Sequence, residues 1–98
     1  MESDIIRHVV RVKQNLNLDN SRELKQELTE VLERGVKQVE LDFANTESVD
    51  SSGLGKILLF SEKFSQNGGS FKITNVVNPG IKELFTLITL ERFVNIDY

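Results

Sequence analysis

Along this chain the spacing of apolar residues changes repeatedly between the period of a strand and the period of a helix. Apolar and polar residues alternate over residues 8–14 and again over 37–43, which predicts two strands. Between these segments the apolar residues lie three and four positions apart, which predicts a helix. Strands that alternate with helices through short connections favour an α/β sheet.

The first helix is predicted to lie between these strands and to end at Gly35, a residue type that commonly ends helices. Asn20 and Glu23 have the spacing of a capping box, so the helix is expected to begin there. A further short strand is predicted near residues 4–6. The apolar residues of the helix share one face and are Leu24, Leu28, Val31 and Leu32.

The second half of the chain continues the alternation of helix and strand. A helix should begin near Ser51 or Ser52, because either hydroxyl can cap free backbone amides. Asn78 followed by Pro79 has the pattern of a cap and a first helical residue. The predicted elements are a helix up to residues 66–69, a strand over 71–77, a helix from 79 and a strand over 93–98.

We therefore expect a single domain over residues 1–98, with helices in alternating β-α order on a mixed sheet of four to five strands. A hydrophobic content of 39% and a single proline are typical of a chain with a compact core. Truncation of Leu28 or Leu58 to Ala is expected to lower the free energy of unfolding by about 2–5 kcal/mol. The residues expected in the core are Leu24, Leu28, Val31, Leu41, Phe43, Leu54, Ile57, Leu58, Ile73, Leu84 and Phe85.

Composition excludes several classes of function. Twelve Lys and Arg against fifteen Asp and Glu give a net charge of -3, the opposite of a surface that binds DNA or RNA directly. The chain has no cysteine, so it has no disulfide and no thiolate metal site. Its N-terminus lacks the pattern of a signal peptide, and its apolar runs are too short to cross a membrane. We expect a cytoplasmic protein.

The sequence offers only weak candidates for the residue combinations that form enzyme active sites. His8 is the only histidine and would have to reach Ser51 across the fold to form a catalytic triad. Asp42 and Asp50 are expected at neighbouring strand and loop ends, but two carboxylates are too few to enclose a cation. Residues 53–56 lack the spacing of a phosphate-binding loop. We therefore expect no catalytic residue, no cofactor and no metal site.

The serine pair that follows Asp50 has two interpretations. The first is helix capping, which is a common use of serine. The second is phosphorylation, because Gly53 and Gly55 leave the first turn bare and the helix amides favour an incoming anion. A phosphate would add about -1.5 to -2 charges at neutral pH, which would change any contact that a partner makes there.

The motif Asp-Ser-Ser-Gly-Leu-Gly at residues 50–55 resembles the phosphorylation motif of the STAS domains of bacterial anti-sigma factor antagonists. Weaker similarities lie on either side of it, including Leu41-Asp42-Phe43 and the segment 81–85. In that family, the unphosphorylated antagonist binds an anti-sigma factor and frees a sigma factor for transcription. The anti-sigma factor is also a serine kinase that inactivates the antagonist, and a PP2C-type phosphatase restores it.

The resemblance implies that Ser51 accepts the phosphate, with Ser52 as the alternative. The residues that it implies for partner binding are Asp50, Ser51, Ser52, Gly53, Leu54, Gly55, Asn17 and Asp19. An alternative of another class is a STAS scaffold, or an interaction domain that senses a small anion, that is never phosphorylated.

Three segments depart from the family pattern. Residues 14–17, Gln-Asn-Leu-Asn, stand where the family commonly has Gly-Glu-Leu-Asp, so both acids have become amides. Residues 87–90, Leu-Ile-Thr-Leu, stand where it has Ile-Thr-Gly-Leu, which removes a glycine from a turn. The segment before the first strand is also several residues shorter than usual, so the first edge strand is expected to be either stunted or missing. These departures concern the choice of partner more than the fold.

Overall fold

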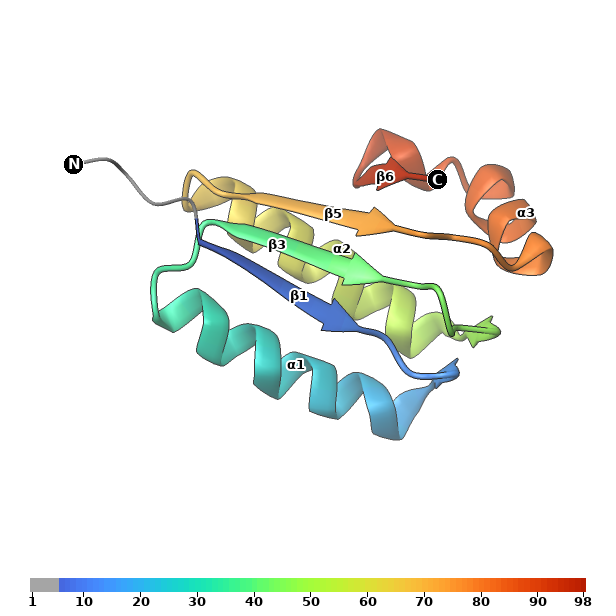
Figure 1. Cartoon of the computed structure of the whole chain (residues 1–98), viewed down its shortest axis with the longest axis horizontal. Helices are drawn as coiled ribbons and strands as arrows, with labels where there is room; N and C mark the ends of the chain where they lie inside the picture. Colours follow the sequence, from blue (N-terminus) through green and yellow to red (C-terminus); the bar gives the residue numbers. More distant parts are fainter. Residues whose placement is uncertain (1–5) are drawn as a thin grey trace.

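A four-stranded sheet forms the centre of the fold in the computed structural model, which describes residues 6–98 (Figure 1). Its strands lie in the order β1 (Arg7–Arg11), β3 (Gln38–Asp42), β5 (Ser70–Thr74) and β6 (Asn95–Asp97). All of the strand pairings described in it are parallel, whereas a mixed sheet was expected. The reason is that a helix or helical segment returns the chain between each pair of neighbouring strands.

Three α-helices make these connections: α1 (Leu18–Glu33), α2 (Ser51–Gln66) and α3 (Pro79–Leu87). A short 3-10 turn, η1 (Leu90–Arg92), follows α3 and leads into β6. Figure 1 shows α2 behind the sheet and α3 beyond the end of β5. None of the helices in residues 6–98 is both long enough and apolar enough to cross a bilayer.

α1 begins earlier than the sequence predicted, because Asn17 and not Asn20 is its N-cap. The backbone of Asn17 is extended, and its side chain accepts a hydrogen bond from the Asn20 amide at 3.1 Å. The Asn20 side chain donates instead to the Asn15 carbonyl. Both asparagines suit a cap by residue type, and the extended backbone that precedes Asn17 decides between them.

A second sheet of two very short strands was not predicted. β2 (Asn15–Leu16) pairs in parallel with β4 (Ser48–Val49), so that Leu16 lies opposite Val49. The pairing extends beyond both strands, since Glu47 donates its amide to the Gln14 carbonyl at 2.7 Å. The predicted strand over 8–14 is shorter in the structure, because β1 ends at Arg11. The strand predicted near residues 4–6 lies mostly outside the described residues, and Ile6 is not in a strand.

The core lies between one face of the main sheet and the two long helices. Leu28 of α1, Ile57 of α2 and Leu41 of β3 are fully buried in it. Leu54 and Leu84 are partly buried against its margin. Of the other predicted core residues, the structure buries Leu24, Val31, Phe43, Ile73 and Phe85.

Leu58 is not a core residue, contrary to the prediction, because it is 41% exposed. The buried residues of α2 include Ile57 and Phe60, and a helical residue is turned by about 100° from the one before it. Leu58 therefore faces outward. The continuous apolar run 57–60 gave no means of choosing which of its members face the sheet.

Thr89 has a left-handed backbone conformation, with φ of 49° and ψ of 46°, in the turn between α3 and η1. A β-branched residue rarely adopts this conformation, because its Cβ crowds the neighbouring carbonyl. This is the position at which the related motif has glycine. The departure seen in the sequence therefore places threonine at a position that suits glycine.

Truncating Leu28 to Ala should lower the free energy of unfolding by about 2–5 kcal/mol, because a fully buried side chain would leave a cavity. The same change at Leu58 should cost less than about 1 kcal/mol, since this side chain is already partly exposed to water. Urea denaturation of the two variants and the parent measures the difference. A larger loss at Leu58 than at Leu28 would contradict the helix register.

Replacing Thr89 with Gly should raise the free energy of unfolding by about 0.5–1 kcal/mol. Relief of the left-handed conformation gives about 1–2 kcal/mol, and the greater freedom of glycine in the unfolded chain offsets part of it. Thr89→Ala is the matched control, because it keeps a Cβ and should change stability little. Equal stabilities of the Gly and Ala variants would show that the turn is not strained.

Candidate functional site

Both long helices begin at the edge of the sheet where β1 and β3 end (Figure 1). The pairing of β2 with β4 fixes the two helix starts relative to each other. Leu16 accepts a hydrogen bond from the Asp50 amide at 3.0 Å, so that the residues following β2 and β4 lie next to each other. These residues are Asn17 and Asp50, the N-caps of α1 and α2.

Asp50, and neither of the serines, caps α2. Its backbone is extended, and its carboxylate Oδ1 accepts a hydrogen bond from the Gly53 amide at 3.0 Å. The prediction of a serine cap was therefore wrong: Ser51 is already the first residue of the helix. Aspartate is as good a cap as serine, and it comes first in the chain.

The structure separates the predicted partner-binding residues by exposure. Asp50, Ser51 and Gly55 are exposed on α2, while Ser52 and Leu54 are half-buried. The two predicted residues of α1 and its cap, Asn17 and Asp19, are also exposed. The Ser51 hydroxyl thus lies at the surface and is not needed to cap its helix.

Gly53 is buried and allows β2 to approach the first turn of α2. A Cβ at this position would lie 2.7 Å from Cγ of Leu16 and 3.1 Å from its carbonyl oxygen. Any larger residue would push the helix start away from β2. Gly53 therefore acts on the site through packing.

The amides that replace the family's acids in residues 14–17 still hold this edge together. Asn17 caps α1 as an aspartate would. Asn15 accepts a hydrogen bond from the Ser48 hydroxyl at 2.7 Å, and the remaining contacts to the 47–50 segment use the backbone. These amides carry no charge, unlike the acids of the family pattern, and their side chains still make hydrogen bonds at this edge.

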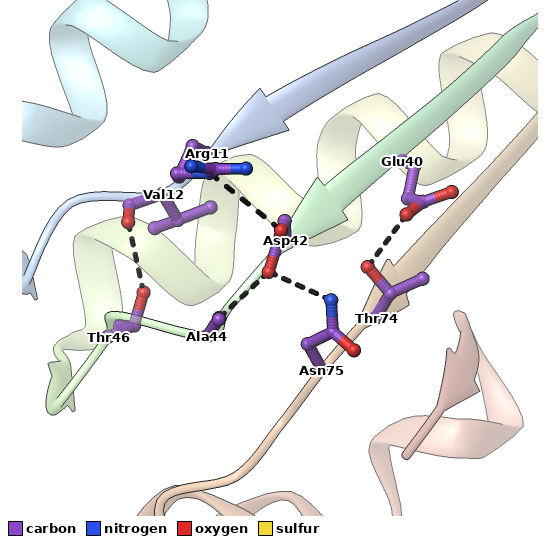
Figure 2. A network of polar contacts seen from close by, with 8 residues as sticks. All are labelled: Arg11, Val12, Glu40, Asp42, Ala44, Thr46, Thr74 and Asn75. Atoms are coloured by element: carbon purple, nitrogen blue, oxygen red, sulfur yellow. Dashed lines mark hydrogen bonds and ion pairs between the residues drawn. The ribbon is translucent and has the colours of Figure 1, made fainter.

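Asp42 organises the end of β3, as Figure 2 shows. The residue is 7% exposed, and its carboxylate accepts hydrogen bonds from the Ala44 amide at 2.9 Å and the Asn75 side chain at 3.2 Å. The Arg11 guanidinium approaches the same carboxylate at 3.9 Å. These contacts join β1, β3 and the segment after β5.

Thr46 fixes the loop that leads from β3 to β4. It is 1% exposed, and its hydroxyl lies 3.3 Å from the Val12 carbonyl (Figure 2). Sequence reasoning did not single out Thr46 or Asn75 for this role. Asn75 directly follows β5, but the predicted strand over 71–77 placed it inside the strand. Together with Asp42, these two residues position the segment that carries Asp50 and Ser51.

Within residues 6–98, the candidate catalytic and metal-binding side chains do not lie together. The His8 ring bonds the Glu27 carboxylate at 2.8 Å, near the start of β1 and away from the helix starts. Asp42 and Asp50 each bond separate backbone amides. Over residues 6–98, no three His, Asp or Glu side chains are close enough together to hold a metal ion.

The sequence model of the "Mlab, STAS domain" family matches residues 2–95. This chain belongs to the STAS domain family. The resemblance seen in the sequence is confirmed. The predicted α/β domain with helices between strands is confirmed with it.

Relatives of this STAS domain include a candidate anti-sigma factor antagonist of Thermotoga maritima. The two are 28% identical over 89 residues, which is 90% of this chain and 78% of that protein. A crystal structure of a candidate anti-sigma factor antagonist from that organism has a TM-score of 0.80 at 28% identity, over 97% of this chain and 83% of the other.

A more distant structure is that of the anti-sigma factor antagonist SpoIIAA in its unphosphorylated form. It has a TM-score of 0.75 at 16% identity, and the match covers 100% of this STAS domain and 84% of SpoIIAA. At this identity the comparison shows a shared fold.

Replacing Asp50 with Ala should lower the free energy of unfolding by about 0.5–2 kcal/mol, because α2 loses its cap. Ser51→Ala should change it by less than about 0.5 kcal/mol, since this hydroxyl caps nothing. Asp50→Asn is the matched control, because asparagine also caps a helix. Thermal or urea denaturation measures all three. A larger loss in the Ser51 variant would assign the cap to serine.

Proposed function

We propose that this STAS domain is an anti-sigma factor antagonist that is switched off by phosphorylation of Ser51. In its unphosphorylated form it binds an anti-sigma factor that is also a serine kinase, and it thereby frees a sigma factor. A PP2C-type phosphatase restores it. A role of this kind belongs in the cytoplasm and requires no catalysis by this chain, because the partner supplies the phosphoryl transfer.

The observation that carries this proposal is the exposed Ser51 hydroxyl directly after the cap of α2. Asp50 caps the start of α2, so the adjacent Ser51 is available to a partner. The names of the Thermotoga maritima relatives support an antagonist role, and the motif at residues 50–55 supports the choice of acceptor.

A phosphate on Ser51 is compatible with the fold. The first amides of α2 have no acceptor within the helix, and the helix dipole favours an anion at this end by about 0.3–1 kcal/mol. No buried contact has to open, because the side chain is already exposed. Folding should therefore be nearly unchanged by the modification.

The same phosphate would disrupt a closely packed interface. It would place a strongly hydrated dianion between the partner and a surface that already carries Asp50 and Asp19. An interface that fits a neutral hydroxyl would have to desolvate this charge or open around it. The switch that we propose thus acts through the interface, with the fold intact in both states.

Ser51→Asp should weaken binding to a purified anti-sigma kinase from the same genome by at least about tenfold, or roughly 1.4 kcal/mol. Ser51→Ala should bind like the parent and accept no phosphate, while Ser52→Ala should still be phosphorylated. Calorimetry measures the binding, and mass spectrometry locates the phosphate after incubation with ATP.

The Ser52 variant distinguishes the two candidate acceptors. Phosphate on Ser52 alone would move the acceptor by one residue. No phosphate on either serine, with a kinase that binds the parent, would overturn the switch and leave an interaction domain that is not phosphorylated.

A further inference from the structure

Five of the six glycines have a reason within the chain to be glycine. Gly35 and Gly68 have φ of +81° and +77°, which other residues rarely adopt. A Cβ at Gly69 would lie 2.4 Å from the Lys37 carbonyl oxygen, and one at Gly53 would collide with Leu16. At Gly80, a Cβ would lie 3.2 Å from the Asn78 side chain that caps α3.

Gly55 has no such reason. Its φ lies outside the left-handed range, and a Cβ at this position would meet no atom of the described residues within 4 Å apart from its chain neighbours and the adjacent backbone of its own helix. It lies in the second turn of α2, where glycine destabilises a helix relative to alanine. The fold alone would therefore favour alanine at this position.

The location of Gly55 indicates why this position has no side chain. Gly55 is four residues after Ser51, so the two lie one above the other on the same side of α2, and both are exposed. A side chain at position 55 would stand next to the Ser51 hydroxyl. A molecule that contacts Ser51 closely must also pass over Gly55.

The neighbouring residues indicate the chemistry of that molecule. Leu58 and Leu59 follow Gly55 by three and four positions, and each is 41% exposed. The outward face of a surface helix usually carries charged and polar residues. Between Ser51 and Glu62, however, the exposed residues of α2 are Gly55, Leu58 and Leu59, and the one charged residue in this part of the helix, Lys56, is half-buried. Beside Ser51, therefore, α2 presents bare backbone and leucine side chains.

We propose that Gly55 determines how closely the partner approaches Ser51, by letting an apolar segment of that partner pack directly on the backbone of α2. This inference rests on the proposed function, and the occupant is the same anti-sigma kinase, since anything that lies on Gly55 also covers Ser51. A second copy of this chain on the same face would close Ser51 to its kinase. Gly55 thus improves recognition at the expense of helix stability.

The test is a size series at Gly55, in the full chain, with the purified anti-sigma kinase as the probe. Gly55→Ala should raise the midpoint of thermal unfolding by about 2–8 °C, because alanine is the better helix former. It should nevertheless weaken kinase binding by at least about tenfold. Gly55→Gln should weaken binding further while remaining folded.

Two matched variants complete the experiment. Glu62 lies on the same side of α2 but about three turns from Ser51, so Glu62→Ala should leave kinase binding unchanged. Gly53→Ala should lower the unfolding midpoint, because its Cβ collides with Leu16. The opposite stability changes expected at Gly53 and Gly55 distinguish a glycine that packing within the fold requires from a glycine that leaves room for a partner.

Three results would overturn the inference. A lower unfolding midpoint in Gly55→Ala would show that this glycine is needed by the fold. Unchanged kinase binding in Gly55→Ala and Gly55→Gln, with the parent binding normally, would refute the clearance role and leave the proposed function intact. A parent chain that neither binds the kinase nor accepts phosphate would refute both.

Discussion

Leu16 and Gly53 make the contact on which the geometry of the site depends. The Leu16 side chain is 2% exposed and occupies the space that a Cβ at Gly53 would need. The carbonyl of the same residue, Leu16, accepts a hydrogen bond from the Asp50 amide. Because β2 can approach α2 this closely, the caps of both long helices lie at one edge of the sheet. A small change in one contact would thus displace Asn17, Asp50 and Ser51 relative to one another.

Asp42 supplies the second constraint, by holding the ends of neighbouring strands together. Parallel strands end at the same edge of a sheet, and their last backbone groups need partners beyond the ladder. The carboxylate of Asp42 bonds the Ala44 amide and the side chain of Asn75, which itself has a left-handed φ of 57°. The loop from β3 to β4 is fixed as a result, and Thr46 ties the same loop to the chain after β1. The helix start that bears Ser51 therefore rests on a loop that is held from both sides.

The sequence predicted the long elements well and the local geometry of the site only in part. The period of α1 was visible because it repeats over two or more turns, and the start of α3 was visible in the Asn78-Pro79 pair. β2 and β4 were not, since two residues cannot show an alternation. At each long helix two or more good cap residues occur close together, as with Asn17 and Asn20, and residue type alone does not rank them. The bond from Asn75 to Asp42 joins positions far apart in sequence, so only the sheet order could reveal it.

The division of labour between Asp50 and Ser51 has a consequence for the evolution of such domains. The cap that the helix requires and the hydroxyl at its surface are supplied by different residues. Mutation can therefore exchange Ser51 for threonine, alanine or an acid with little effect on folding. A lineage can gain, lose or mimic the proposed phosphorylation at this position through single substitutions, each of which leaves a folded protein for selection to act on. Regulation and architecture are in this way free to diverge at different rates.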